Sequence, residues 1–377
     1  MKIGIIGGGI CGLATAIALR KQGIDCLVFE RAPQLNEVGA GIVLQPNAMQ
    51  VLELLGIGEQ VRSAGRPLDR MEITDAQLQS IRKNQQPLIT DPLGNGFVAI
   101  HRARLQQALF EALPAGSVIL GKAYQQHVAT AEGVQVFFED GSNVHFDLLL
   151  GSDGIHSVVR QQLFQGTALR YSGQTCWRGI APVTMPDEVA SVGREAWGRR
   201  LRFGIVPVSE TEVYWFAVAN APAGGKDERN LLHQQLPAQF HQFHPQISEI
   251  IRQTPMEKMI RNDIYDLQRL PSWHQGRVLL LGDAAHATTP NMGQGACQGI
   301  EDAHYISRLL AHNSNAAVVF PEFERLRRKK VDYVVNNSWQ FGQMAHKPLS
   351  QAILRMAIKW MPESMMQRQT QLLFEVN

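Results

Sequence analysis

The sequence has few of the features that mark a secreted, metal-binding or disulfide-stabilised chain. Its 377 residues hold four cysteines, Cys11, Cys26, Cys176 and Cys297, with neither a CxxC pair nor Cys/His metal spacing. We therefore expect no metal site and interpret the cysteines as reduced thiols, which are typical of a cytoplasmic protein. Lys2 is followed by a short apolar run and then by glycines, which is a poor secretory signal.

An excess of one charge is also missing. The 36 Lys and Arg residues nearly balance 34 Asp and Glu, so the net charge is only +2 and we expect no nucleic-acid partner. We interpret the basic stretch from Arg325 to Lys330 as a solvated helix face. No apolar run approaches the roughly 20 residues of a membrane span. The amphipathic segment Ala352–Met361 is predicted to pack on its own protein, with contact to a membrane or partner as the alternative.

Apolar residues are plentiful enough for a large core and about two domains, at 45% hydrophobic and 19% charged. Ile3–Ile6 predicts a strand buried on both faces, Leu13–Lys21 a helix, and Cys26–Phe29 a second buried strand. Together these three segments predict a βαβ-type opening. Pro46–Leu55 predicts a further helix, because proline is favoured at a first helical position and Gly56 follows the end.

The middle of the chain changes character. Alternating apolar residues, separated by glycines and by Asp-Gly or Glu-Gly pairs, predict mostly antiparallel strands inserted into an α/β frame. The expected strands are Met71–Thr74, Val134–Phe138, Thr175–Val183, Leu201–Val206 and Val213–Ala219. Helices are expected again at Glu228–Phe243, and from Gly293 the pattern is helical to near the end.

The first motif is the glycine loop Gly7-x-Gly9-x-x-Gly12, directly after the first strand. Gly7 permits the tight turn, Gly9 lets the backbone approach a pyrophosphate, and Gly12 allows close helix–strand packing. Glu30 lies 18 residues after Gly12, near the distance at which an acidic residue accepts from a ribose hydroxyl. The loop predicts a dinucleotide site, and alone it does not separate FAD from NAD.

The second motif is Ser152-Asp153-Gly154, after the apolar strand Phe146–Leu150. An ordinary turn is the alternative interpretation of an Asp-Gly pair at this place. Ser157 and Arg160 fall on the first turns of the helix expected next, at an end that suits phosphate.

The third motif follows the strand Arg277–Leu281 and begins with Gly282-Asp283. An aspartate at the carboxyl end of a strand suits a polyol hydroxyl. Gly293 and Gly295 leave room for a flat ring, and the N-terminal dipole of the helix that starts there favours an anionic reduced ring. Two such distant segments built around one long cofactor favour FAD.

With these three segments in this order, the chain resembles the single-component FAD-dependent aromatic hydroxylases, typified by para-hydroxybenzoate hydroxylase. The stretches Tyr171–Gly173 and Thr175–Gly179, with Arg202 five residues before Pro207, are similar to the branch of salicylate hydroxylases, FAD-dependent urate hydroxylases and zeaxanthin epoxidases. The resemblance spans nearly the whole chain. It implies an α/β fold: a Rossmann-like FAD-binding domain of the GR2 type, an inserted and mostly antiparallel substrate domain, and a C-terminal helical tail.

The boundaries that we assign to these parts are approximate. The FAD-binding domain is expected at 1–75, 98–170 and 271–330, the substrate domain at 76–97 and 171–270, and the helical tail at 331–377. The resemblance, combined with the motifs, gives an expected set of cofactor-binding residues. They are Gly7, Gly9, Cys11, Gly12, Glu30, Arg31, Gly41, Val43, Arg104, Tyr124, Asp153, Gly154, Arg160, Gly282, Asp283, Pro290, Gly293, Gln294, Gly295, Ala296 and Cys297.

The resemblance also implies a reaction. NAD(P)H binds transiently, because the chain has a single GxGxxG, and it reduces bound FAD. O₂ then adds at flavin C4a, and the resulting hydroperoxide hydroxylates or epoxidises a small aromatic or enolic substrate. Alternatives are another flavin reaction on the same scaffold, or a flavin-binding interaction module without turnover. No Trp-x-Trp-x-Ile-Pro segment of a flavin halogenase occurs.

Substrate residues are expected on the strands of the inserted sheet. Arg202 and Tyr214 are the predicted catalytic residues, and Trp177 and Arg178 the predicted pocket residues. An inward arginine binds a carboxylate or enolate, and a tyrosine orients a phenolate. A surface position for Arg202 and core positions for Tyr214 and Trp177 are the alternatives. We expect a small-molecule substrate and O₂ as partners and a monomer or homodimer.

Overall fold

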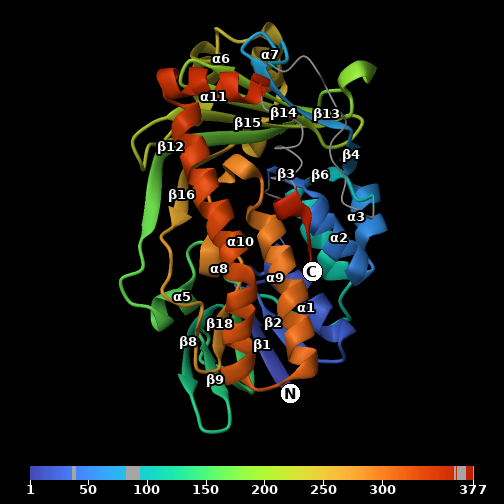
Figure 1. The fold of residues 1–377 in the computed structure, drawn as a ribbon, viewed down its shortest axis with the longest axis vertical. Helices are drawn as coiled ribbons and strands as arrows, with labels where there is room; N and C mark the ends of the chain where they lie inside the picture. The colour runs from blue at the N-terminus through green and yellow to red at the C-terminus, as the bar shows by residue number, and fades with distance from the viewer. Residues whose placement is uncertain (36–39, 82–93, 361, 363–370, 377) are drawn as a thin grey trace.

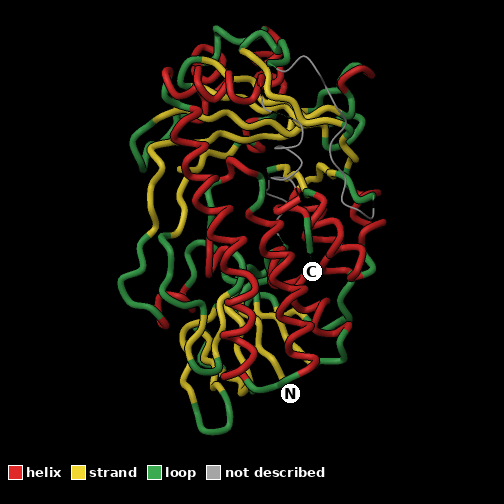
Figure 2. The backbone as a smooth tube through the Cα atoms, in the orientation of Figure 1, coloured by secondary structure: helices red, strands yellow, loops and turns green. Residues whose placement is uncertain are grey.

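The computed structural model describes residues 1–35, 40–81, 94–360, 362 and 371–376. Two six-stranded sheets lie toward opposite ends of the long axis, and helix α10 (Ala316–Ala345) runs along that axis between them (Figure 1). Figure 2 shows the same division, with strands gathered in two groups and most helices between and beside them. The mixed α/β class predicted from the sequence is confirmed.

The first sheet is parallel except at one edge, where β17 pairs antiparallel with β18. In spatial order its strands are β17 (His274–Gln275), β18 (Val278–Leu280), β11 (Leu148–Gly151), β1 (Lys2–Ile6), β2 (Asp25–Phe29) and β7 (Val118–Ile119). The chain moves from β1 toward β2 on one side and returns much later to β11 on the other. The crevice between β1 and β11 is therefore a topological switch point, where α/β sheets bind ligands.

Helix α1 (Ile10–Lys21) begins directly after Gly9, three residues before the predicted start. The turn at the end of β1 is completed by Gly7, whose φ of 106° is accessible mainly to glycine. Because the turn needs no residue beyond Gly9, the helix already includes Ile10, Cys11 and Gly12. Ile3, Ile5 and Leu13 are fully buried in the large core around this sheet, as expected for a strand covered on both faces.

The second sheet is antiparallel except for its edge strand β5, which runs parallel to β13. In spatial order its strands are β16 (Ile260–Leu267), β12 (Leu169–Ala181), β15 (Val213–Asn220), β14 (Leu201–Pro207), β13 (Val192–Gly198) and β5 (Arg70–Asp75). The predicted boundary after residue 75 assigns β5 to the FAD-binding domain, whereas the strand pairs within this second sheet. Part of the predicted segment 76–97 lies outside the described residues, and the domain boundaries stay a prediction.

Two small three-stranded sheets complete the strands. They are β10 (Asn143–Phe146), β9 (Val134–Phe138) and β8 (Tyr124–Ala129), and β3 (Gly41–Leu44), β6 (Phe97–His101) and β4 (Arg66–Leu68). Most of the helices cover the sheets. They are α2 (Pro46–Leu55), α3 (Gly58–Ala64), α4 (Arg102–Glu111), α5 (Val158–Leu163), α6 (Leu232–Gln239), α7 (Pro245–Gln253), α8 (Asp283–His286), α9 (Gly295–His312) and α11 (Pro348–Trp360), with short 3-10 turns η1 (Asp187–Val189), η2 (Arg229–Leu231), η3 (Met256–Lys258) and η4 (Pro290–Met292).

The C-terminal region differs from the prediction in two respects. The predicted boundary between 330 and 331 falls inside α10, which continues to Ala345. The side chains of Ile353, Met356 and Trp360 on α11 are more than half exposed, whereas Gln351 is buried and donates to the Gly198 and Ala345 carbonyls. Met356 and Trp360 also line a shallow pocket with Asp75 and Ile81, so α11 packs on its own protein, but less fully than predicted. Met361 lies outside the described residues.

Candidate functional site

The glycine loop and the Asp-Gly segment meet at the carboxyl ends of β1 and β11. A Cβ added at Gly7 would lie 2.5 Å from the Ser152 carbonyl oxygen, and one added at Gly12 would lie 2.0 Å from the Gly7 oxygen. The Ser152 hydroxyl donates to the Ile6 carbonyl at 3.0 Å. Gly9 differs, because a Cβ there would meet nothing within 4 Å. Gly7 and Gly12 thus serve close packing, and Gly9 leaves its backbone open to a ligand.

Two helix N-termini at this site have no side-chain cap. Neither α1 nor α9 has a side-chain hydrogen bond at its N-cap or an acidic residue in its first turn. In α4, α5, α7 and α10, by contrast, a side chain accepts from a first-turn N–H. The free N–H groups and the dipole at the start of α1 and α9 suit anionic groups, such as a pyrophosphate and an electron-rich ring. The residues present therefore fit FAD.

Glu30 lies at the end of β2 and faces the glycine loop. Its Oε2 accepts from the Gly8 amide at 2.7 Å and its Oε1 from the Ala32 amide at 2.9 Å. The carboxylate is thereby fixed beside the loop at the place expected for a ribose contact. Arg31, the next residue, is exposed to solvent.

The Asp-Gly segment holds two parts of the site together. The Asp153 carboxylate accepts from Ser157 Oγ at 2.5 Å and from the Val158 amide at 2.7 Å, so it caps the start of α5. Burial raises the pKa of Asp153, against these hydrogen bonds. Arg160 is buried and donates to the Ala284 carbonyl at 3.1 Å and to the Ile155 carbonyl at 2.6 Å. Arg160 therefore links the Asp-Gly segment to the Gly-Asp segment.

The Gly-Asp segment packs on the glycine loop. Gly282 has a φ of 55°, and a Cβ there would lie 2.9 Å from Cys11 Sγ. The Asp283 side chain, in the first turn of α8, is exposed. Pro290 opens η4, and Gly293 ends it with a φ of 63°. The predicted cofactor residues around Cys11, Asp283 and Gly293 are thus brought together in space.

The start of α9 is anchored to the start of α2. Gln294 is fully buried, donates to Gln45 Oε1 at 2.6 Å and accepts from Asn47 Nδ2 at 3.1 Å. Cys297 is fully buried with its Sγ 3.7 Å from the Gly293 carbonyl, and burial raises its pKa to about 12. Cys297 is therefore a protonated packing residue. Gly295 and Ala296 between them are half-buried at the uncapped helix start.

A buried ion network, which the sequence analysis did not predict, lies under the Gly-Asp segment. Asp302 accepts from the Gly282 amide at 2.9 Å, lies 2.6 Å from His286 Nε2, and accepts from Arg327 Nε at 2.8 Å. Arg327 also pairs with Glu301 at 2.5 Å. Although burial opposes it, His286 and Arg327 hold the pKa of Asp302 below its ordinary value.

This network corrects the prediction that Arg325–Lys330 is a solvated helix face. Arg325 is exposed, but Arg327 is 1% exposed, and Lys330 pairs with buried Glu301 at 2.8 Å. The helical period places residues 327 and 330 on the inner side of α10. Spacing along the helix was the available signal, because Phe320, Phe323 and Val331 lie on the same buried side.

Strand alternation sorts the four predicted substrate residues onto two faces of the second sheet. Ile180, Val206 and Tyr214 belong to one apolar cluster and Trp177, Phe203 and Trp215 to another. Because successive strand residues point to opposite faces, Arg178 and Arg202 share the face of Tyr214. Trp177 lies on the opposite face, where its indole donates to Asp227 at 2.7 Å. The structure therefore places Arg178, Arg202 and Tyr214 on one face of the sheet and Trp177 on the other.

Tyr214 lies against Gly41 of β3, a predicted cofactor residue. A Cβ added at Gly41 would lie 2.4 Å from the Tyr214 side chain, so the two are in close contact. Burial raises the pKa of Tyr214 to about 12, while the nearby Arg178 guanidinium opposes the rise. Tyr214 is consequently protonated at neutral pH and available as a hydrogen-bond donor. Val43, another predicted cofactor residue, packs on the same cluster.

Arg202 is 2% exposed, so it is not a surface arginine. Its Nε donates to His346 at 2.8 Å, Nη1 pairs with Glu195 at 3.0 Å, and Nη2 donates to Asn291 Oδ1 at 2.5 Å. Burial and the Arg202 charge lower the pKa of His346 to about 3, so this histidine is neutral and accepts. Arg202 thus joins the second sheet to η4 and the end of α10. These three bonds use three of its five N–H groups and leave two that can donate to a substrate.

Two predicted cofactor residues have other partners. Arg104 pairs with Glu212 through Nη2 and Oε2 at 2.7 Å. The Tyr124 hydroxyl lies 2.6 Å from His127 Nδ1 and 2.6 Å from Gln162 Oε1. These bonds give both residues a structural role, and cofactor contact by them stays a prediction.

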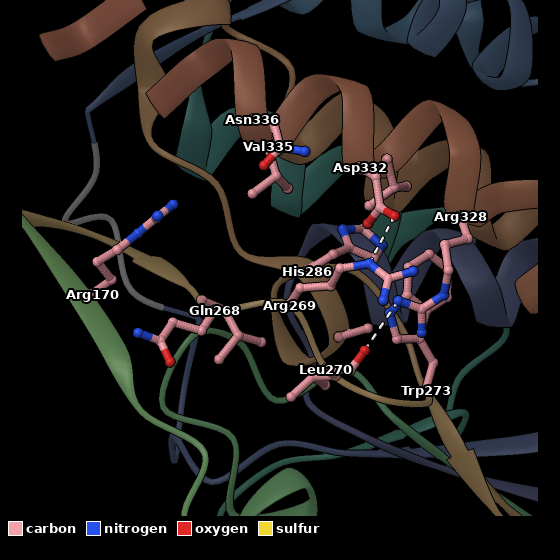
Figure 3. A pocket seen from close by; sticks show the side chains of 13 residues that line it. Arg170, Gln268, Arg269, Leu270, Trp273, His286, Arg328, Asp332, Val335 and Asn336 are labelled. Atoms are coloured by element: carbon pink, nitrogen blue, oxygen red, sulfur yellow. Dashed lines mark hydrogen bonds and ion pairs between the residues drawn. The ribbon is translucent and has the colours of Figure 1, made fainter. Parts of the chain in front are cut away.

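A cavity of about 230 Å³ lies beside α8, α10 and the segment after β16 (Figure 3). His286 and Trp273 line it, and none of the predicted cofactor or pocket residues does. Its arginines are already paired: Arg269 Nε lies 2.9 Å from Asp332 Oδ2, and Arg328 donates to the Leu270 carbonyl at 3.1 Å. Arg170, the third arginine of the lining, pairs with Asp266 at 2.7 Å, so each of the three lining arginines already has a partner, and the cavity borders the Gly-Asp segment through Ala285 and His286 without including a predicted cofactor or pocket residue.

The helices of the described residues include none that combines the length and apolar character needed to cross a membrane. Residues 1–319 match the FAD binding domain family, so the chain belongs to that family. Within it the relatives are FAD-dependent monooxygenases, and the predicted likeness to FAD-dependent urate hydroxylases is confirmed. The protein is accordingly an FAD-dependent monooxygenase of the aromatic hydroxylase class, whose members typically use NAD(P)H and O₂.

Individual relatives cover most of the chain. Aurachin C monooxygenase/isomerase from Stigmatella aurantiaca is 38% identical over 340 residues, covering 90% of this chain and 88% of the relative. The 2-heptyl-3-hydroxy-4(1H)-quinolone synthase from Pseudomonas aeruginosa is 31% identical, covering 99% and 98%. The crystal structure of Klebsiella pneumoniae HpxO with FAD and uric acid has a TM-score of 0.90 at 29% identity, covering 99% of this chain and 96% of that one.

Proposed function

We propose that this monooxygenase hydroxylates a planar aromatic heterocycle that carries a ring carbonyl and a ring N–H. The observation that carries the proposal is the shared face of Arg178, Arg202 and Tyr214, which looks toward Gly41 and Asn291 on the cofactor side. Uric acid and 4(1H)-quinolones, named for two relatives, are both rings of this kind.

The three residues suit the chemistry of such a ring. Hydroxylation by an electrophilic oxygen is favoured when the ring is electron-rich, as in its enolate or deprotonated form. The guanidinium groups of buried Arg202 and half-buried Arg178 would stabilise that anion. The protonated Tyr214 donates a hydrogen bond to the ring carbonyl and so fixes the orientation of the ring.

Bound FAD supplies the redox chemistry, because it takes electrons from NAD(P)H and passes them to O₂. In the overall reaction one substrate C–H, NAD(P)H, O₂ and a proton give C–OH, NAD(P)⁺ and water. Gly9 and the open start of α1 would hold the pyrophosphate, and Gly293 to Ala296 the ring. The apolar side chains around Tyr214 exclude water from the reacting carbon.

Three further expectations belong to the same proposal. NAD(P)H binds transiently, since the chain has a single glycine loop of the dinucleotide type. All four cysteines are free, which supports a cytoplasmic location. The assembly is proposed to be a monomer or a homodimer.

A substrate panel tests the proposal. The purified protein, loaded with FAD, is mixed with NADH or NADPH and with urate, 4(1H)-quinolones, salicylate or no addition. We expect heterocycles with a ring carbonyl to stimulate NAD(P)H oxidation and to yield a product heavier by one oxygen. Stimulation by salicylate alone, or oxidation without hydroxylated product across the panel, would contradict the proposed substrate class.

A further inference from the structure

The last described residues of the chain return to the middle of the molecule. Residues 371–374 form a helical turn, and Figure 1 places the C-terminus between the two sheets, near α9 and α2. Leu373 and Phe374 are buried, whereas the adjacent Leu372 is 63% exposed. A chain end that buries two large apolar side chains has a specific docking position.

That position lies in the same hydrophobic cluster as Tyr214, one of the predicted substrate residues. Phe374 contacts Phe97 of β6 edge to face, with ring centroids 5.6 Å apart. Leu373 and Phe374 belong to one contiguous hydrophobic cluster with Tyr214, and Val43 and Met292 pack against it. The cluster therefore joins the chain end to a predicted catalytic residue and to two residues of the cofactor side.

A charged contact also holds the chain end. Lys330 Nζ donates to the Glu375 carbonyl at 2.8 Å and pairs with Glu301 at 2.8 Å. Glu301 belongs to the buried network that fixes the Gly282 amide through Asp302 and Arg327. The C-terminal turn is thus tied to the same framework that positions the cofactor segment.

The resulting surroundings of Tyr214 are asymmetric. On the sheet, Arg178 and Arg202 offer positive charge, while the two buried side chains of the described chain end, Leu373 and Phe374, are apolar. We propose that Leu373 and Phe374 form the apolar wall of the substrate space and select rings that carry an apolar side chain. This inference rests on the proposed function and names the substrate feature that the same site would recognise.

A series of ligands with increasing alkyl length tests the wall directly. The FAD-loaded protein is titrated with 4(1H)-quinolones bearing hydrogen, methyl, pentyl or heptyl at position 2, and binding is followed by the change in the flavin absorption spectrum. In the unaltered protein we expect affinity to rise with chain length, since each buried methylene adds apolar contact. In Phe374→Ala we expect the heptyl compound to bind about tenfold more weakly and the unsubstituted ring to bind within about twofold.

The neighbouring residue supplies the matched control. Leu372→Ala removes a side chain of similar size that faces solvent, and it should leave the whole series unchanged. A variant that ends at residue 370 should lose the dependence on chain length while keeping its flavin. Equal weakening of all four ligands in Phe374→Ala, or affinity independent of chain length in the unaltered protein, would overturn the wall.

Failure of the wall and failure of the proposed function give different results. If urate perturbs the flavin spectrum and stimulates NAD(P)H oxidation but no alkylquinolone binds, the proposed function stands and the wall is refuted. If no heterocycle stimulates oxidation, the proposed function fails. In that case the titration still tests the wall separately: if Phe374→Ala binds the four quinolones as the unaltered protein does, the wall is refuted as well.

Discussion

The two faces of the second sheet use the same strands for different purposes. On one face Trp177 and Trp215 pack beneath α6 and α7, and their indole N–H groups donate to Asp227 and Thr254, each at 2.7 Å. On the other, Arg178, Arg202 and Tyr214 lie toward the cofactor side. Trp177 and Trp215 find partners 50 and 39 residues away within the substrate-domain segment, whereas Arg202, besides Glu195 seven residues away, reaches His346 and Asn291 at 144 and 89 residues.

This difference shows how one sheet combines stability with chemistry. Because side chains alternate, each predicted site residue has a direct neighbour in sequence that faces the closed core. Arg202 is followed by Phe203 and Tyr214 by Trp215, and both neighbours are fully buried. Each pair therefore allows a matched comparison, in which substitution of one residue should affect turnover and substitution of its neighbour should affect stability.

The largest effect is expected for the pair on β14. Arg202→Lys keeps a charge but loses the planar fork that binds His346, Glu195 and Asn291. We expect kcat/KM to fall about 100-fold, equal to roughly 2.7 kcal/mol of transition-state stabilisation, with flavin content retained.

Phe203→Ala is the control, and it should cost about 3–5 kcal/mol of unfolding free energy through the cavity left in the core. Its folded fraction should keep a kcat/KM close to that of the unaltered protein. Urea unfolding measures the unfolding free energy of both variants, and steady-state kinetics measure their kcat/KM. Equal losses of activity and stability in both would remove the distinction between the faces.

A smaller effect concerns pH. The folded-state pKa of Tyr214, about 12, lies above the ordinary value of about 10. The native protein therefore keeps a proton that the unfolded chain releases, and the related stability is fully present below pH 10 and is lost as pH rises toward 12. The loss is on the order of 2 kcal/mol.

Tyr214→Phe should remove this part of the alkaline decline, whereas Trp215→Phe should leave the decline unchanged because it removes no titrating group. Unfolding free energies at several pH values between 9 and 12 measure the effect. Identical alkaline profiles for Tyr214→Phe and the unaltered protein would show that Tyr214 is not buried as described.

The smallest effect is on coupling. Tyr214→Phe removes the proposed hydrogen bond to the substrate and should lower the fraction of NAD(P)H that yields product by about fivefold, worth about 1 kcal/mol. Trp215→Phe loses the bond to Thr254 and should leave coupling intact. Product formed per NAD(P)H oxidised is the measured ratio, and a normal ratio in Tyr214→Phe would make this residue a bystander.

Local patterns predicted much of this structure, and distant contacts were not predictable. The glycine loop and the strand period could be recognised because turns, alternation and capping depend on residues a few positions apart. The alternation of side chains along the strands also contains the information that places Trp177 on the sheet face opposite Tyr214. The bonds from Arg202 to Asn291 and His346, and from Asp302 to Arg327, depend on tertiary packing, so Arg327 resembled a surface charge in the sequence. The docking of Phe374 on Phe97 joins residues 277 positions apart in the chain.

Isotope labelling tests the central claim most directly. FAD-loaded protein turns over 2-heptyl-4(1H)-quinolone or urate with NAD(P)H under ¹⁸O₂, and the mass of the product is measured by mass spectrometry. The account predicts one ¹⁸O atom from O₂ in the product, in step with NAD(P)H oxidised, and loss of this labelled product in Arg202→Lys. A product whose new oxygen comes from water, or NAD(P)H oxidation that gives only hydrogen peroxide with every ring tested, would contradict it.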